Sequence, residues 1–246
     1  MHRKLFALAR DNAGKGAGIR SEIDGDTATI YIYDVIDSYW GVSAADLANA
    51  LQGITASTLV MRINSPGGDV FEARAMMALL SEFSGTVTAK IDGLAASAAS
   101  FLMLAASTIE IAEGGFVMIH KGWTMMMGNA DDLRSTADLL DKVDSSIVSN
   151  YAAKTGKSAD DILAWMKAET WFDAAEAVEN GFCNSVMPTT AAKADAKAKA
   201  STFNLSVYDK APKALTEQQP PEDDQDLEAL RVANLARLGL YERTAA

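Results

Sequence analysis

Short apolar strands alternate with helical segments through the first half of the chain, and this alternation constrains the fold more than any other feature. Residues 27–33 alternate in polarity and are rich in β-branched and aromatic side chains, as strands are. Further strands are predicted at 57–63, 86–91, 108–111 and 116–119, and helices at 43–51, 69–83 and 96–105. This spacing predicts an α/β fold in which helices cover a mainly parallel sheet. Such sheets bind ligands at the ends of their strands.

The second half is predicted to be mostly helical before it ends in a short strand. A long helix at 130–154 carries apolar residues along one stripe, and Gly156 ends it. Two further helices are predicted at 158–168 and 173–180, and the strand ends at Pro188.

The composition changes after Pro188, which predicts three regions: an N-terminal lead-in at 1–26, a folded domain at 27–188, and a linker with a tail at 189–246. Residues 189–200 are rich in Ala and Lys, and residues 211–224 are rich in Pro, which is typical of a partly disordered linker. A short amphipathic helix is predicted at 226–238. It is either a docking element for a partner or a marginal, frayed helix.

The composition also excludes several classes of function. The 246 residues are 49% apolar, which is enough for one sizeable core. The formal net charge of -11 argues against nucleic acid as the main partner, because phosphate backbones attract Lys and Arg. The longest apolar run, 95–109, is too short to span a bilayer, and we recognise no secretory signal. We therefore expect a cytoplasmic protein that does not bind membranes.

Metal and cofactor chemistry are not expected either. The chain has two histidines and one cysteine, Cys183, too few for the usual closed set of nitrogen and sulfur ligands. A single cysteine cannot form an internal disulfide, which fits a reducing compartment. We expect Cys183 to be a small buried packing residue.

A serine and a histidine stand where this fold could bring them together. Ser97 lies among alanines at the start of a predicted helix, and His120 ends a predicted strand. A serine hydroxyl becomes a nucleophile when a base takes its proton, and histidine is the usual base near neutral pH. Taken alone, Ser97 could simply allow close helix packing, and His120 could be a structural histidine. Together they predict a nucleophile and its base.

Backbone N–H groups from two segments could complete such a site. Gly67 and Gly68 follow a predicted strand, and glycines let the backbone approach a ligand closely. Their N–H groups could face a developing oxyanion, although a simple turn after Pro66 is the alternative. The N–H of Ala98, at the start of a helix, also favours negative charge.

These segments, in this order, resemble the signature segments of the ClpP family, the proteolytic subunits of the Clp protease. The resemblance covers about residues 27–187. It is carried by Asn64-Ser65-Pro66-Gly67-Gly68, Gly93-Leu94-Ala95-Ala96-Ser97, Met118-Ile119-His120, and Thr155-Gly156-Lys157-Ser158 followed by the segment 172–181.

The resemblance implies a ClpP/crotonase-like fold of stacked β-β-α units with a projecting long helix, here about 130–154. It also implies a homo-oligomeric ring and a serine endopeptidase that acts on protein substrates without a cofactor. Ser97 matches the family nucleophile and His120 the general base, while Gly68 and Ala98 match the two oxyanion donors. Gly67 is expected to contact the substrate.

The third catalytic residue is where the sequence departs from the family. The resemblance places Glu169 at the position of the family's imidazole-orienting Asp. A glutamate can hold the imidazole too, but its longer side chain requires a backbone that lies farther back. Asp173 is the next candidate, although it also suits the cap of the helix that begins at 174. The third possibility is a Ser–His dyad oriented by another group.

The residues after His120 and the C-terminal extension also depart from the family. Lys121-Gly122-Trp123 replaces the common Gln-Pro, so the strand that lines the substrate groove differs. Three adaptable methionines begin at Met125, which either line that groove or pack in the core or in a ring contact.

The extension, Glu169 and Trp171-Phe172 resemble the ClpP-like head-maturation proteases of tailed phages. This resemblance implies an ATP-independent peptidase that cleaves scaffold and capsid proteins in the host cytoplasm or inside the procapsid. Three alternatives stay open: a cellular ClpP paralogue that works with an unfoldase, a catalytically silent ring that serves assembly, and an acyl-CoA-handling enzyme on a related fold.

Overall fold

The computed structural model describes residues 8–12, 18–187 and 203–216. The low-complexity segment 189–200 and the helix predicted at 226–238 lie outside these ranges. Within them, no helix combines the length and apolarity that crossing a bilayer requires.

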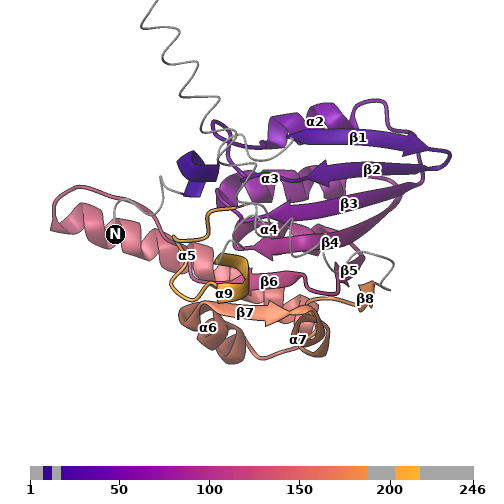
Figure 1. The fold of residues 1–246 in the computed structure, drawn as a ribbon. Helices are drawn as coiled ribbons and strands as arrows, with labels where there is room; N and C mark the ends of the chain where they lie inside the picture. The colour runs from indigo at the N-terminus through magenta and orange to yellow at the C-terminus, as the bar shows by residue number, and fades with distance from the viewer. Residues whose placement is uncertain (1–7, 13–17, 188–202, 217–246) are drawn as a thin grey trace, which may run out of the picture. The chain divides into compact units, whose positions relative to one another are not determined.

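Eight strands form one sheet, and helices follow most of them (Figure 1). The strands are β1 Ile19–Asp24, β2 Thr27–Ile32, β3 Thr58–Ser65, β4 Thr86–Ala96, β5 Thr108–Ala112, β6 Phe116–Ile119, β7 Thr170–Asp173 and β8 Ser185–Met187. The helices are α2 Ala44–Leu51, α3 Val70–Ser81, α4 Ala98–Leu102, the 3-10 turn η1 Met103–Ala105, α5 Ala130–Thr155, α6 Ala159–Ala168, α7 Ala174–Glu179 and α9 Lys213–Thr216. A further helical turn covers 8–12.

The sheet is mainly parallel, which confirms the α/β fold predicted from the sequence. Its order is β1-β2-β3-β4-β5-β8, and only β1 is antiparallel within this path. β4 pairs with β5 through its first half and with β6 through Leu94–Ala96. β7 then adds to β6 in the antiparallel direction. The sheet therefore branches at β4, whose first half pairs with one strand and whose last residues pair with another. Ser97 directly follows the last of these paired residues.

Local sequence signals fix the long helix, α5. The Asn129 side chain accepts the N–H groups of Asp131 and Asp132, and the Asp132 carboxylate accepts the N–H of Asn129 in return. This capping box satisfies donors that a helix start leaves unpaired. Gly156, with φ +70°, ends the helix in the left-handed region. In Figure 1 the N-terminal part of α5 extends past the sheet.

The sheet buries apolar residues on both faces near β4 and β6. Ala95 and Val117 belong to the main core, which the helices α3, α4 and α5 help to form. Their neighbours Leu94, Ala96 and Met118 point to the opposite face, because successive side chains of a strand alternate. This second face also needs a cover.

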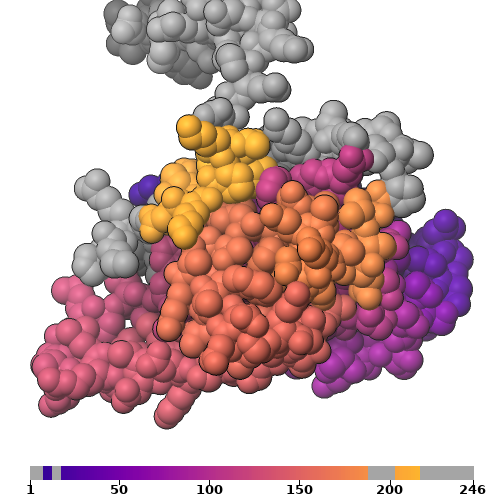
Figure 2. Space-filling view, turned by 90° about the horizontal axis from the view of Figure 1, so that it is seen from below, coloured from indigo at the N-terminus to yellow at the C-terminus, as the bar shows by residue number. Residues whose placement is uncertain are grey.

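Residues 203–216 supply that cover, which differs from the linker and tail predicted for 189–246. Phe203, Leu205, Val207, Tyr208 and Leu215 are buried against the second face. Burying an apolar side chain of this size contributes about 1.5–3 kcal/mol. The space-filling view shows this segment lying against the part of the chain around β7 and α7 (Figure 2). The Pro-rich stretch 211–224 predicted a linker and gave no sign of this docking, although Phe203, Leu205 and Val207 alternate with polar residues.

Two other expectations differ from the structure. The lead-in predicted for 1–26 contains β1, which pairs with all of β2. β1 is an exposed edge strand, so it lacks the apolar alternation by which strands are recognised. The helix predicted for 96–105 begins only at Ala98, because β4 extends to Ala96. Small apolar residues read alike in a buried strand and a buried helix.

Candidate active site

The structure brings Ser97 and His120 together. The Oγ of Ser97 lies 2.7 Å from the Nε2 of His120. β4 ends at the serine and β6 ends just before the histidine, and these two strands are neighbours in parallel register. Because parallel strands end on the same edge of a sheet, the two residues meet there although 23 positions separate them.

Ser97 has an unusual backbone conformation. Its φ is 53° and its ψ is -122°, a backbone conformation that residues other than glycine rarely adopt. Such a conformation costs about 1–3 kcal/mol and persists only where the surroundings enforce it. Here the Ser97 N–H donates to the Met118 carbonyl at 2.9 Å. This sharp turn between β4 and α4 aims the hydroxyl out of the sheet, toward the histidine.

The loop with Gly67 and Gly68 packs directly against this turn. A Cβ at Gly67 would lie 2.5 Å from the Ala96 carbonyl oxygen and 2.7 Å from the Ser97 Cβ. A Cβ at Gly68 would lie 2.1 Å from the carbonyl oxygen of Ile36. Both glycines also have positive φ, +91° and +147°. Only glycine therefore fits this close approach of backbone to the serine.

Two backbone N–H groups of this region are placed to receive an oxyanion. Gly68 and Ala98 both line the cavity beside the serine. Among the hydrogen bonds within the described ranges, neither N–H donates to a protein acceptor. The Gly67 N–H instead donates to the Ser65 Oγ at 3.2 Å, and Gly67 does not line the cavity. The geometry thus gives Gly67 a packing position rather than the expected substrate contact.

A cavity of about 310 Å³ opens beside the Ser97–His120 pair. It is lined by residues from the glycine loop, from the segment after His120 and from α5, among them Val70, Trp123, Thr124, Leu140 and Ile147. The lining is mostly apolar, and Ser97 and His120 are among its polar residues. Met125, expected in the groove, is exposed and lies outside this lining. The structure places Gly122 to Thr124 there instead.

His120 is neutral at physiological pH in this environment. Burial lowers the pKa of His120 to about 4, and the negative charge of Asp144 opposes that shift. Trp123 and Tyr208 contact the imidazole edge to face, with ring centroids 5.3 and 5.6 Å away. A neutral imidazole whose Nε2 faces a hydroxyl can accept its proton.

Asp144, a buried acid of α5, was not singled out from the sequence. Its Oδ1 accepts the Gly122 N–H at 2.7 Å, and its Oδ2 lies 3.1 Å from the Nζ of Lys121. It therefore holds the two residues that directly follow His120. The sequence signal was an acid on the apolar stripe of a predicted helix, and such a residue usually needs a partner.

The structure does not bring Glu169 to His120. Its carboxylate accepts the N–H groups of Asp209 and Lys210 at 3.0 and 2.7 Å, and the indole N–H of Trp171 at 3.3 Å. No hydrogen bond among the described residues joins it to the imidazole. The expectation that Glu169 completes a triad is thus wrong for this structure, because the C-terminal segment occupies its carboxylate.

Asp173 does not reach the histidine either. Its side chain accepts the Glu176 N–H at 2.9 Å, and the Glu176 carboxylate accepts the Asp173 N–H. It is the N-cap of α7, which was the alternative role predicted for it from the sequence. Within the described residues, no carboxylate forms a hydrogen bond with the His120 imidazole, and the arrangement is that of a Ser–His pair.

Two buried hydroxyl groups, those of Ser100 and Tyr151, hold the backbone of Ser97. The Ser100 Oγ donates to the Ser97 carbonyl at 2.6 Å and lies 2.7 Å from the Tyr151 hydroxyl. Because the Ser100 hydrogen is committed to the carbonyl, Tyr151 donates to Ser100. The chain thus runs from α5 to the strained backbone of Ser97.

Comparisons with known proteins point to one family. The model of the family described as Clp protease matches residues 27–190. The ATP-dependent Clp protease proteolytic subunit 1 of Protochlamydia amoebophila is 30% identical over 170 residues, which are 66% of this chain and 81% of that protein. The subunit 1 of Chlamydia muridarum is 33% identical over 134 residues, 52% of this chain and 69% of that protein. The corresponding subunit of Bacteroides fragilis is 31% identical over 127 residues, 51% of this chain and 61% of that protein, so the chain spans about three fifths of this relative.

Proposed function

This chain belongs to the Clp protease family, and on that premise we propose that it is a serine endopeptidase that hydrolyses peptide bonds through Ser97 and His120. The observation that carries the proposal is the 2.7 Å contact between the Ser97 Oγ and the His120 Nε2 at the edge of an open cavity. Gly68 and Ala98, whose N–H groups have no acceptor among the described residues, line the same cavity. Nucleophile, base and oxyanion donors are the parts that acyl transfer needs.

The reaction proceeds in two halves. The Ser97 oxygen attacks the scissile carbonyl carbon while its proton passes to the His120 Nε2. The carbonyl oxygen becomes an anion that the Gly68 and Ala98 N–H groups stabilise. The C–N bond then breaks, His120 gives its proton to the leaving amine, and an acyl-enzyme remains. Water attacks the ester by the same route in reverse, which releases the acid and restores the serine.

Asp144 supplies the electrostatic support in this dyad. Its charge raises the pKa of His120 against the effect of burial. A carboxylate that favours the imidazolium stabilises the ion pair formed when the serine proton is transferred. Asp144 also ties Gly122 in place, and Gly122 lines the cavity.

We further propose that copies of this chain assemble into a ring that acts on protein substrates. Large apolar side chains are exposed on α5 and on the loop before it, including Leu133, Leu139 and Met127. Exposed apolar groups of this kind are typical of surfaces that a second chain covers. The curated relatives are themselves named as proteolytic subunits.

The finer role that we propose is cleavage of scaffold and capsid proteins during phage head maturation, without ATP. What supports it is the C-terminal extension beyond the family match at 27–190 together with Glu169 in place of the family's Asp. The competing role is that of a cellular paralogue fed by an unfoldase, which the names of the relatives favour. An adjacent capsid, portal or scaffold gene would support the first role.

A fluorophosphonate probe tests the chemistry directly, because it forms a covalent bond only with an activated serine. We expect mass spectrometry to locate the label on Ser97, and expect no label in Ser97→Ala or His120→Ala. Cleavage of an unfolded protein without ATP should follow the same pattern. A folded oligomer whose Ser97 does not react would instead favour a catalytically silent assembly protein.

A further inference from the structure

The segment 203–216, which covers the second face of the sheet, is anchored at two separate points. At one point the Glu169 carboxylate accepts the backbone N–H groups of Asp209 and Lys210. Two charge-assisted hydrogen bonds to one carboxylate fix both the position and the direction of a backbone.

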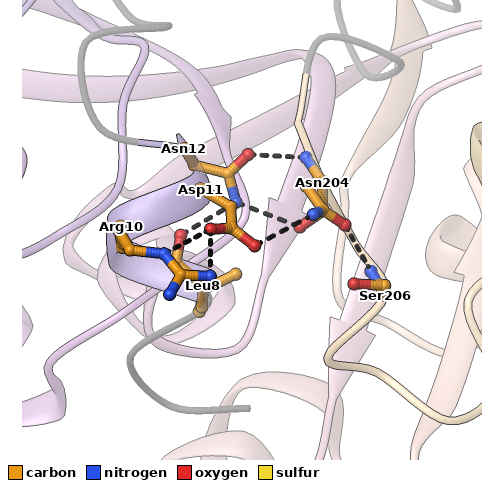
Figure 3. A network of polar contacts seen from close by, with 6 residues as sticks. All are labelled: Leu8, Arg10, Asp11, Asn12, Asn204 and Ser206. Carbon is orange, nitrogen blue, oxygen red and sulfur yellow. Dashed lines mark hydrogen bonds and ion pairs between the residues drawn. The ribbon is translucent and has the colours of Figure 1, made fainter. Parts of the chain in front are cut away.

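The second anchor joins the segment to the helical turn at 8–12, as Figure 3 shows. The Asn12 amide accepts the Asn204 N–H and donates to the Asn204 carbonyl at 3.0 Å. The Asn204 amide in turn donates to Asp11 at 3.3 Å. Asn12 is buried and also donates to the Leu8 carbonyl at 2.9 Å. Segments about 190 positions apart are thus joined by paired side-chain and backbone contacts.

Between these anchors, Tyr208 reaches the catalytic residues. Its hydroxyl donates to the Pro66 carbonyl at 2.6 Å. Its ring meets His120 edge to face at 5.6 Å, and it also contacts Trp123 and Trp171. The side chain is buried. One residue of the extension therefore contacts both the catalytic histidine and the proline that opens the glycine loop.

The contact with Pro66 bears on the oxyanion donor. Pro66 opens the glycine loop, and the loop's far end is held by Ile36, whose N–H donates to the Gly67 carbonyl at 2.9 Å. Tyr208 fixes the preceding carbonyl. With both peptide groups held, the direction of the Gly68 N–H is set before any substrate binds, as electrostatic preorganisation requires.

The segment does not obstruct the site. None of the described residues 203–216 lines the cavity beside Ser97, although both catalytic side chains do. Tyr208 therefore packs on a part of the imidazole that does not face the cavity. The Ser97–His120 hydrogen bond is also formed while the segment is docked. Both observations favour support of the site over inhibition.

We propose that residues 203–216 complete the catalytic site, and that Tyr208 is a positioning residue which fixes the Pro66 carbonyl and shields the His120 imidazole from water. Glu169 then acts as the anchor of this segment instead of the acid of a triad. The inference rests on the proposed function, since it assigns these residues to the peptidase site.

Tyr208→Phe tests the hydroxyl in the full-length chain, because it keeps the ring and removes only the hydrogen bond to Pro66. We expect the second-order rate of fluorophosphonate labelling at Ser97 to fall about three- to tenfold, as losing one orienting hydrogen bond predicts. Tyr39→Phe is the matched control, since the Tyr39 side chain is exposed and is not part of the cavity lining. It should label at the unaltered rate. A Tyr208→Phe rate equal to that of the control would overturn the proposal.

The pKa of His120, measured by NMR, tests the shielding without any need for activity. The chain has only two histidines, so a His2→Gln variant assigns the signals. Removing the ring in Tyr208→Ala should admit water and raise the pKa of His120 from about 4 toward 6.5. An unchanged pKa, or faster labelling in this variant, would contradict the proposal, and faster labelling would show that the segment obstructs the site.

Glu169→Ala separates the two possible roles of this glutamate by the sign of the change. Loss of an anchor loosens the segment and raises the pKa of His120, whereas loss of a triad carboxylate beside the imidazole would lower it. We expect the rise. If Ser97 in the unaltered protein does not react with the probe, the proposed function fails, and the His120 pKa still decides whether Tyr208 shields the imidazole.

Discussion

Gly68→Ala should abolish most of the activity without unfolding the protein. In the structure a Cβ at this position lies 2.1 Å from the Ile36 carbonyl oxygen and 2.9 Å from its carbon, although real Cβ atoms essentially never come within 3.0 Å of such atoms. The φ of +147° adds strain for any residue with a side chain. The loop must therefore retreat by roughly 1 Å, a displacement of the size that disrupts catalytic geometry.

The retreat moves the Gly68 N–H away from the oxyanion. Loss of one such donor lowers kcat by about 10²–10³-fold, which is about 2.7–4 kcal/mol of transition-state stabilisation. KM should change little, because the donor is aimed at the charge that develops in the transition state. Steady-state hydrolysis of a fluorogenic peptide gives both constants, and thermal unfolding shows whether the variant remains folded.

Gly53→Ala provides the matched control for backbone strain. Gly53 also has a left-handed φ, +76°, but a Cβ there meets nothing within 4 Å. Its stability should fall by about 1–2 kcal/mol, the usual cost of a left-handed non-glycine residue, while kcat stays unchanged. If Gly68→Ala folds and its kcat matches that of Gly53→Ala, the Gly68 N–H is not an oxyanion donor and the reasoning fails.

Three further predictions follow from the buried groups near the site. The pKa of His120 is lowered from 6.5 to about 4, so between pH 6.5 and pH 4 the unfolded chain binds a proton at this residue that the folded chain does not. Acidification over this range should therefore lower the free energy of unfolding. The loss, measured in urea titrations, should be about 3 kcal/mol larger for the unaltered protein than for His120→Gln. Asp144→Asn keeps an acceptor for the Gly122 N–H but removes the negative charge that raises the pKa of His120. The pH below which the rate of fluorophosphonate labelling falls should therefore move to a lower value. A move to a higher pH would contradict the role assigned to Asp144. Tyr151→Phe leaves the buried Ser100 Oγ without its donor, which should lower the free energy of unfolding by about 1–3 kcal/mol in urea titrations, and an unchanged value would exclude the assigned hydrogen bond.

Local patterns were sufficient to predict most strands and helices. The alternation at 27–33 and the short apolar runs after it became β2 to β6, and their parallel order followed from the helices between them. The capping residues of α2 and α5 stand where the sequence signals predicted helix starts. β1 was missed because an exposed edge strand leaves almost no apolar pattern.

The contact between Ser97 and His120 was also within reach of the sequence. Both residues end parallel elements, so a correct strand order brings them to one edge of the sheet. The structure adds the positive φ at Ser97 and the two N–H groups, of Gly68 and Ala98, that have no acceptor in the part of the chain it describes. The sequence indicated these features only by its small residues. Gly67 and Met125 were expected to contact the substrate, and neither lines the cavity.

The sequence by itself determined the α/β fold, the serine with its histidine, and the glycine loop, because each depends on residues close together in the chain or on the regular order of strands. Only the tertiary structure decided the partner of Glu169. Its carboxylate belongs to Asp209 and Lys210, forty positions away, in a segment whose composition predicted a linker. A side chain as long as that of Glu can reach several partners. Which backbone N–H groups it binds depends on which segment packs on the apolar face of β4 and β6. That choice is made by packing, which no local pattern records.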